Sequence, residues 1–206
     1  MIVAPGNRAR NPPKLLQDFF HVPQEIENTL GKVSLKNLFF SIGVGVFKAF
    51  VGGQIVSLAA KVGVIPDFNE SQMMTEMCAT VSKIDHFFFQ ASFTGPIVEE
   101  LIMRYAIQEF LPKKILKNMI PGKETVLDSK VAAAARIVLT ASLFASLHLL
   151  NKGIFPDSYC HAQVIDSFIG GMTYGALKES EVGLLGSIVA HMSNNILASV
   201  STFFYC

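Results

Sequence analysis

The chain has 206 residues, which is enough for one domain of ordinary size. Half of the residues are hydrophobic and only 16% are charged, against roughly 25% in a typical soluble domain. This composition excludes a disordered chain and argues against an ordinary soluble globule. The 17 basic and 16 acidic residues nearly cancel, so the chain offers no global basic field and is not expected to bind nucleic acid.

Five apolar stretches follow one another along the chain, and none shows sustained strand-like alternation. They cover residues 38–65, 84–111, 131–150, 162–177 and 183–204. A membrane helix needs about 20 residues of low charge, and only the fourth stretch is clearly shorter than that. The sequence therefore predicts a single all-α membrane domain over residues 1–206, a polytopic transmembrane bundle of about five helices.

Basic residues are distributed unevenly between these stretches. The N-terminal segment 1–37 has five Lys or Arg residues and the connection 113–130 has five lysines, whereas the connections 66–83 and 151–161 have one lysine each. Loops that stay in the cytoplasm carry an excess of Lys and Arg. We therefore expect the N-terminus and the 113–130 connection to face the cytoplasm.

The three cysteines are Cys78, Cys160 and Cys206. They are odd in number, far apart and without a CxxC spacing, so they suggest no disulfide framework. The expectation is that they are buried small hydrophobic residues.

Three charges lie inside the second apolar stretch: Glu99, Glu100 and Arg104. Each charge in the middle of a bilayer costs about 2.5–3.5 kcal/mol on insertion scales, so these groups need partners. Glu100 and Arg104 are four residues apart and can pair on one helix face, whereas Glu99 points about 100° away. A carboxylate left without a counter-charge suits a general base, although packing or snorkelling charges are the alternative. The preceding Gly95-Pro96 pair predicts a kink or a restart of the helix.

Two further polar pairs occur in apolar stretches. Phe144 and His148 are four residues apart near the end of the third stretch, and His191 and Asn195 are four apart in the uncharged fifth stretch. Polar side chains in membrane helices usually face the bundle interior. Taken singly, each pair is explained by a structural histidine or by contacts between helices. Together with Glu99, they could activate a water molecule and stabilise an oxyanion.

These residues resemble the signature of the CPBP family, the CAAX-protease and bacteriocin-processing group of intramembrane proteases, also called the Abi family. The family motifs EExxxR, FxxxH and HxxxN occur here in order, at Glu99, Glu100 and Arg104, at Phe144 and His148, and at His191 and Asn195. The glycine-rich stretch 168–175 also resembles the segment that precedes the last motif. The resemblance covers a core of residues 93–198, about half of the chain.

The resemblance implies a helical bundle with an intramembrane catalytic cavity and a glutamate-dependent endopeptidase acting on a peptide or protein. Glu99 would activate the water together with His148, and His191 and Asn195 would hold the oxyanion. The site-orienting residues would be Glu100, Arg104 and Phe144. The resemblance further implies an integral protein in the lipid bilayer of a bacterial-type inner membrane or plasma membrane. The chain is shorter than eight-helix members of the family, and its first 83 residues match no motif, so a prenylated substrate is not implied.

No cofactor is expected, and zinc is the alternative. Glu99, His148 and His191 could in principle hold zinc, since catalytic zinc commonly has three protein ligands and a water. Against this, the sequence has no HExxH motif, and a Glu100–Arg104 ion pair leaves Glu99 free to act as a base. Two other functions stay open: a non-catalytic membrane scaffold or partner-binding protein of the same fold, and a transporter whose buried charges relay protons.

Overall fold

The computed structural model describes residues 31, 34–66, 75, 78–79, 86–119, 124–152, 155 and 157–206. Over these residues the fold is all-α, with no strand, as the sequence predicts. The elements in chain order are α3 (Leu35–Lys61), α5 (Phe87–Phe89), the π-helical η1 (Gln90–Thr94), α6 (Gly95–Glu100), the π-helical η2 (Leu101–Phe110), α7 (Leu111–Met119), the 3-10 helix η3 (Glu124–Asp128), α8 (Lys130–Leu147), the 3-10 helix η4 (His148–Asn151), α9 (Asp157–Lys178) and α10 (Gly183–Tyr205). The fourth apolar stretch gives a longer helix than expected, because α9 already begins at Asp157.

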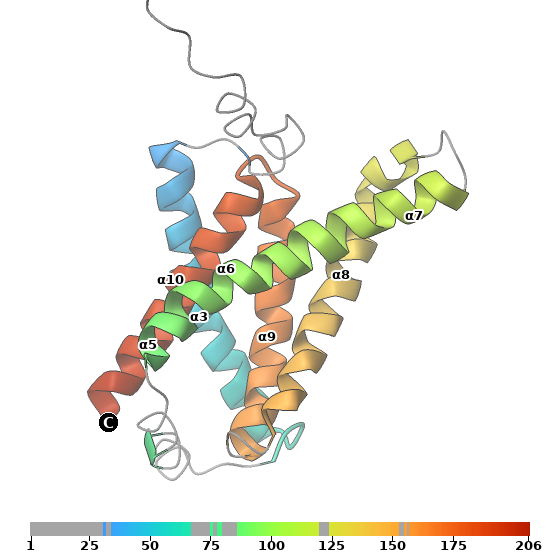
Figure 1. The fold of residues 1–206 in the computed structure, drawn as a ribbon. Coiled ribbons are helices and arrows are strands. Elements are labelled where there is room, and N and C mark those ends of the chain that lie inside the picture. The colour runs from blue at the N-terminus through green and yellow to red at the C-terminus, as the bar shows by residue number, and fades with distance from the viewer. Residues whose placement is uncertain are drawn as a thin grey trace, which may run out of the picture.

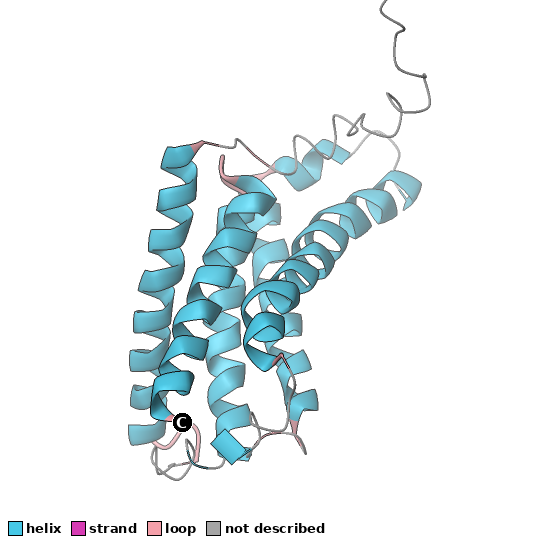
Figure 2. Ribbon diagram, turned by 60° about the vertical axis from the view of Figure 1, so that its left-hand side comes forward, coloured by secondary structure: helices cyan, strands magenta, loops and turns pink. Residues whose placement is uncertain are grey.

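The long helical runs alternate in direction through the bundle (Figure 1). Helix α10 packs against both α3 and α9, and α9 packs against α8. The run from α5 to α7 crosses the other helices obliquely and reaches α10 through η1 and α6. Figure 2 shows the same bundle from the side, with the remaining long helices roughly aligned. This packing places α9 and α10 at the centre of the molecule.

The helix that carries Glu99 and Glu100 passes through Pro96 without restarting, so the expected restart is wrong. The reason lies in the π-helical turn η1, where the Gly95 N–H donates to the Gln90 carbonyl five residues earlier. This register accommodates the missing N–H of Pro96 within a continuous helical run from Phe87 to Met119.

The bundle buries many polar side chains beside its hydrophobic core and exposes many large apolar ones. Its buried polar or charged residues include Lys48, Ser92, Glu100, Arg104, Gln108, Thr140, Ser187, His191 and Asn194. Large apolar side chains are exposed along α3, α8 and η4, among them Phe39, Phe47, Phe50, Leu139 and Leu150. Among the described helices, α3 and the run 130–151 are long and apolar enough to cross a membrane. Polar side chains that face the bundle interior, with large apolar side chains outside, are typical of helices that lie against lipid.

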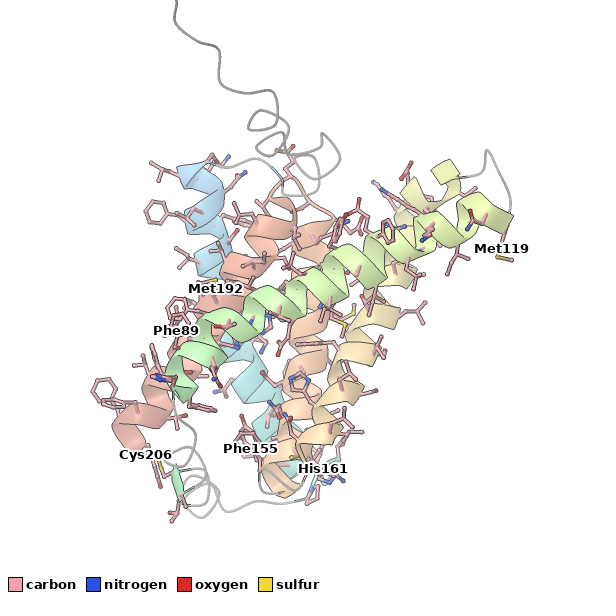
Figure 3. All side chains as sticks on the ribbon, in the orientation of Figure 1. Phe89, Met119, Phe155, His161, Met192 and Cys206 are labelled. Carbon is pink, nitrogen blue, oxygen red and sulfur yellow. A yellow bond between two sulfur atoms is a disulfide. The ribbon has the colours of Figure 1, made fainter. Side chains whose placement is uncertain are left out.

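A disulfide joins Cys78 to Cys206, with the two Cα atoms 5.5 Å apart, so the expectation of buried thiols is wrong for this pair. Cys206 lies at the end of α10 (Figure 3), and Cys78 belongs to the segment between α3 and α5. The cysteines are 128 residues apart, and only the folding of the bundle brings them together. The expectation holds for Cys160, which is fully buried.

A buried ion pair between Glu100 and Arg104 anchors the oblique helix, as the four-residue spacing predicts. The Arg104 Nε donates to Oε2 of Glu100 at 3.1 Å, and both side chains are at most 1% exposed. The Ser187 hydroxyl of α10 donates to the same carboxylate. The pair therefore joins the oblique helix to the centre of the bundle.

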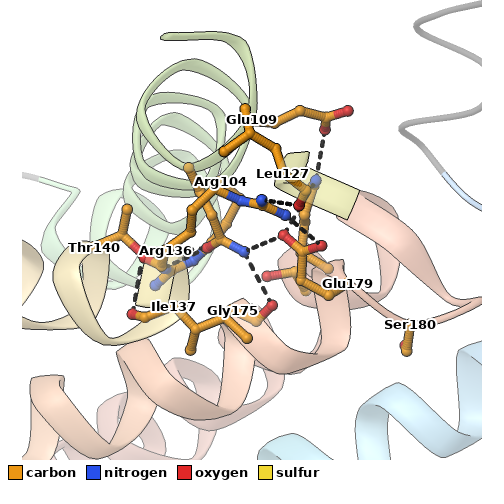
Figure 4. A network of polar contacts seen from close by, with 12 residues as sticks. Arg104, Glu109, Leu127, Arg136, Ile137, Thr140, Gly175, Glu179 and Ser180 are labelled. Carbon is orange, nitrogen blue, oxygen red and sulfur yellow. Dashed lines mark hydrogen bonds and ion pairs between the residues drawn. The ribbon is translucent and has the colours of Figure 1, made fainter. Parts of the chain in front are cut away.

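A network of polar side chains extends from Arg104 toward the 113–130 connection (Figure 4). The Arg104 Nη1 donates to Gln108 at 3.2 Å and to the Thr140 hydroxyl of α8 at 3.1 Å. The Gln108 amide donates to Glu179 at 2.8 Å, and Arg136 pairs with Glu179 at 3.1 Å. The network thus joins η2, α8 and the turn after α9.

We expect Arg104→Ala to destabilise the protein by about 3–5 kcal/mol, because it strands the Glu100 carboxylate without its cation in a buried site. Expression yield and thermal unfolding in detergent measure this loss. Lys113→Ala is the matched control: its partner Glu109 lies on the same helix and Lys113 itself is 47% exposed, so the expected loss is at most about 1 kcal/mol.

A double variant, Glu100→Leu with Arg104→Leu, removes both charges and should recover part of the stability that Arg104→Ala loses. Unchanged yield and unfolding temperature in Arg104→Ala would show that the ion pair does not hold the bundle together.

Candidate active site

A cavity of about 540 Å³ lies between the oblique helix and helices α3, α9 and α10. Five of the residues singled out from the sequence line it: Glu99, Phe144, His148, His191 and Asn195. The other two, Glu100 and Arg104, are fully buried. Four-residue spacings on separate helices therefore converge on one cavity.

Glu100 holds His191 in place through one of its two ring nitrogens. Its Nδ1 lies 3.0 Å from Oε1 of Glu100, whose other oxygen is bound by Arg104 and Ser187. An ionised carboxylate only accepts hydrogen bonds, so Nδ1 of His191 carries the proton and Nε2 is the nitrogen left for chemistry. The buried ion pair thus sets both the orientation and the tautomer of this imidazole.

Glu99 lies near the other ring nitrogen of His191, Nε2. Its side chain is 40% exposed, it lines the cavity, and its Oε2 lies 3.6 Å from Nε2 of His191. In the described part of the chain, no Lys or Arg forms an ion pair with Glu99. The two adjacent carboxylates therefore have different environments: that of Glu100 is buried and ion-paired, and that of Glu99 faces the cavity.

Phe144 lies between the two imidazoles that line the cavity. Its ring makes T-shaped contacts with His148, with centroids 4.7 Å apart, and with His191, with centroids 5.9 Å apart. The His148 Nδ1 donates to the Phe144 carbonyl at 2.9 Å, so Nε2 is again the nitrogen without the proton in the neutral ring. His148 begins the 3-10 turn that follows α8. Phe144 therefore spaces the two histidines and fixes one of them.

Asn195 supplies a hydrogen bond that the backbone of the π-helical turn lacks. Its Nδ2 donates to the Ala91 carbonyl at 2.9 Å, and its Oδ1 accepts from Asn194 at 2.9 Å. In the π register the fifth residue after Ala91 would bind this carbonyl, but that residue is Pro96, which has no N–H. One N–H of the Asn195 amide satisfies the carbonyl, and the second stays available at the cavity wall.

Sequence reasoning missed two residues that contact this group. Ser187 donates to Glu100 and lies one helical turn before His191, so the four-residue spacing could have revealed it. Tyr174 stacks on His191 with ring centroids 4.5 Å apart and planes 20° apart. It lies in the glycine-rich stretch 168–175, which was noted only for its resemblance to the family. The imidazole of His191 is thus fixed on its face as well as at Nδ1.

The side chains proposed as zinc ligands do not gather as a metal site. Over the residues that the structure describes, no three His, Cys, Asp or Glu side chains are close enough to hold a metal ion. Both histidines donate from Nδ1 and leave Nε2 free, as zinc-ligating histidines also do, so these hydrogen bonds do not decide between the two mechanisms. The mechanism proposed below uses no metal, and its metal dependence is tested there.

The comparison with protein families confirms the resemblance seen in the sequence. The family described as type II CAAX prenyl endopeptidase Rce1-like matches residues 85–197, more than half of the chain. Neither a curated protein nor a solved structure matches the chain. The matched region contains every residue of the three motifs, from Glu99 to Asn195, and the family together with the two apolar helices indicates a membrane-embedded protease. The chain belongs to the type II CAAX prenyl endopeptidase Rce1-like family.

Proposed function

We propose that this protein is an intramembrane endopeptidase that hydrolyses a peptide bond with a water molecule activated by Glu99. One observation carries the proposal. Of two adjacent carboxylates, Glu100 is bound to Arg104 and His191, and Glu99 faces the cavity 3.6 Å from His191 Nε2. A cavity-facing carboxylate beside an oriented imidazole is suited to general acid–base catalysis.

In the proposed reaction, Glu99 takes a proton from a water molecule, with His148 helping to orient it. The water oxygen attacks the peptide carbonyl carbon, and the carbonyl oxygen becomes the oxyanion of a tetrahedral intermediate. The free N–H of Asn195 donates to this oxyanion, and so does His191 once its Nε2 shares the proton that Glu99 took from the water. When the C–N bond breaks, Glu99 returns the proton to the leaving amine, so the products are an acid and an amine.

The proposed orientation in the membrane places the N-terminus in the cytoplasm. The disulfide between Cys78 and Cys206 supports it, because disulfides persist on the oxidising side of a membrane. In Figure 3, Cys206 and the cavity residue Phe155 lie toward one end of the bundle, and Met119, within the lysine-rich 113–130 connection, lies toward the other. The distribution of lysines and the position of the disulfide thus favour the same orientation. In this orientation the cavity lies in the half of the bundle away from the cytoplasm. We place the protein in a bacterial-type inner membrane or a plasma membrane.

Glu99→Gln should lower peptide cleavage by at least about 100-fold while the protein stays folded, because glutamine keeps the shape of the side chain but cannot act as a base. Purified protein in detergent is incubated with a proteome-derived peptide pool, and new termini are counted by mass spectrometry. Glu181→Gln makes the same change at an exposed carboxylate and should cleave like wild type. Equal cleavage by Glu99→Gln would refute the role of Glu99, and no cleavage by wild type would favour a non-catalytic scaffold.

Activity should survive removal of metal, since the proposed water activation needs only the carboxylate. Phenanthroline is dialysed in and out of the purified protein, and the same cleavage assay is repeated without added metal. Elemental analysis should find well under one zinc per chain. Stoichiometric zinc, together with activity that is lost on chelation and restored only by zinc, would reverse the assignment to a zinc-dependent mechanism.

The orientation predicts which surface cysteines an impermeant thiol reagent reaches in intact cells. In a background where Cys160 is replaced by Ser and the native disulfide is kept, Lys61→Cys should be labelled and Lys114→Cys should not. Both side chains are exposed, so accessibility within the protein is matched. Labelling should become equal after the cells are permeabilised. The opposite pattern in intact cells would invert the topology.

A further inference from the structure

We propose that Asp166 forms a specificity subsite of the cavity, which accepts a basic side chain of the peptide substrate. The inference rests on the proposed peptidase function. Asp166 lies on α9 and lines the same cavity as Glu99 and His191, yet the catalytic scheme above does not use it. No motif in the sequence includes it, since it is an isolated carboxylate in the fourth apolar stretch.

The carboxylate of Asp166 is held by a buried lysine and is itself open to the cavity. Lys48 of α3 binds Oδ2 of Asp166 with its ammonium nitrogen 2.5 Å away. The lysine side chain is 3% exposed and the aspartate side chain is 36% exposed. The group that the ion pair presents to an incoming ligand is therefore the hydrogen-bond acceptor, not the cation.

Two glycines make room for this ion pair. A Cβ atom at Gly52 of α3 would collide with Oδ1 of Asp166. A Cβ atom at Gly170 of α9 would lie 3.2 Å from Cε of Lys48 and 3.1 Å from Cε2 of Tyr174. The backbones of α3 and α9 thus approach the pair at positions where only glycine fits without displacement. Both helices therefore carry a glycine at the place where the ion pair needs space.

A second unused polar group lies between this pair and the catalytic histidine. Tyr174 is 1% exposed and lines the cavity, and its ring stacks on His191. Its hydroxyl has no hydrogen-bond partner among the residues that the structure describes. A buried hydroxyl without a partner is costly, so a ligand group that binds it gains affinity. Tyr174 connects the Asp166 subsite to the place where the peptide bond would lie.

The charges around the cavity select the class of ligand. Among the described residues that line it, two carboxylates, Glu99 and Asp166, and one ammonium, that of Lys48, are the fully charged groups. The carboxylates outnumber the ammonium, so an acidic side chain is repelled and a lysine or arginine side chain is attracted. An ammonium or guanidinium also has several N–H donors, enough for both Asp166 and the Tyr174 oxygen.

The test compares substrates that differ only in this charge. Cleavage sites from the peptide pool should show Lys or Arg enriched at one fixed position relative to the cut. Two synthetic peptides are then made, with lysine or the uncharged isostere norleucine at that position. Asp166→Asn should lower kcat/KM for the lysine peptide about tenfold, mainly through KM, because a hydrogen bond to a charged group is lost. The norleucine peptide should be cleaved equally by both proteins.

The control is Asp128→Asn, the same change at an exposed aspartate outside the cavity, which should keep the preference for lysine. If Asp166→Asn does not fold, the charge-free double variant Lys48→Met with Asp166→Leu takes its place. A wild-type protein without preference for lysine would overturn the subsite, as would equal losses on both peptides, which would show that the ion pair only joins α3 to α9.

A binding measurement separates failure of the subsite from failure of the proposed peptidase. Fluorescent versions of apolar peptides with a single lysine or norleucine are titrated into the Glu99→Gln protein, with and without Asp166→Asn. Tighter binding of the lysine peptide that disappears with Asp166→Asn supports the subsite even if the wild-type protein cleaves nothing. Equal binding of the two peptides overturns the subsite even if cleavage occurs.

Discussion

The buried ion pair between Glu100 and Arg104 is the interaction on which the other features of the site depend. It places two opposite charges, each fully buried, at the contact between the oblique helix and α10. Burying a carboxylate is tolerable only when its lone pairs are satisfied, and Arg104, Ser187 and His191 do this for Glu100. Because His191 is one of these partners, the requirement to satisfy a buried charge also orients the imidazole that meets Glu99.

The same requirement explains why the polar side chains inside the bundle contact one another while large apolar side chains lie outside. Hydrogen bonds between side chains, from Arg104 through Gln108 to Glu179, join helices that expose Phe and Leu to their surroundings. In lipid, helices gain little from apolar contacts with one another, so polar contacts and close packing decide how they assemble. The cavity lies next to this network, which helps to keep a cavity-facing carboxylate and two histidines in fixed positions.

A local feature of the backbone links the fold to the chemistry. Pro96 cannot supply the N–H that the Ala91 carbonyl needs, and Asn195 supplies it from α10. The helix therefore keeps its direction and carries Glu99 to the cavity wall, while the Asn195 amide is held with one N–H still available. π-Helical turns often occur at functional sites, and here the turn joins the helix that carries Glu99 to Asn195 of the last motif.

Much of this could be read from the sequence, because helical periodicity is local. The apolar stretches determined the helices, and four-residue spacing determined the Glu100–Arg104 pair and the shared face of Phe144 and His148. Only the tertiary structure decided the contacts between residues far apart in the chain: the disulfide from Cys78, the stacking of a tyrosine on His191, and the assembly of the separate motifs around one cavity. Such contacts depend on how whole helices cross, and no periodicity within a single helix records that.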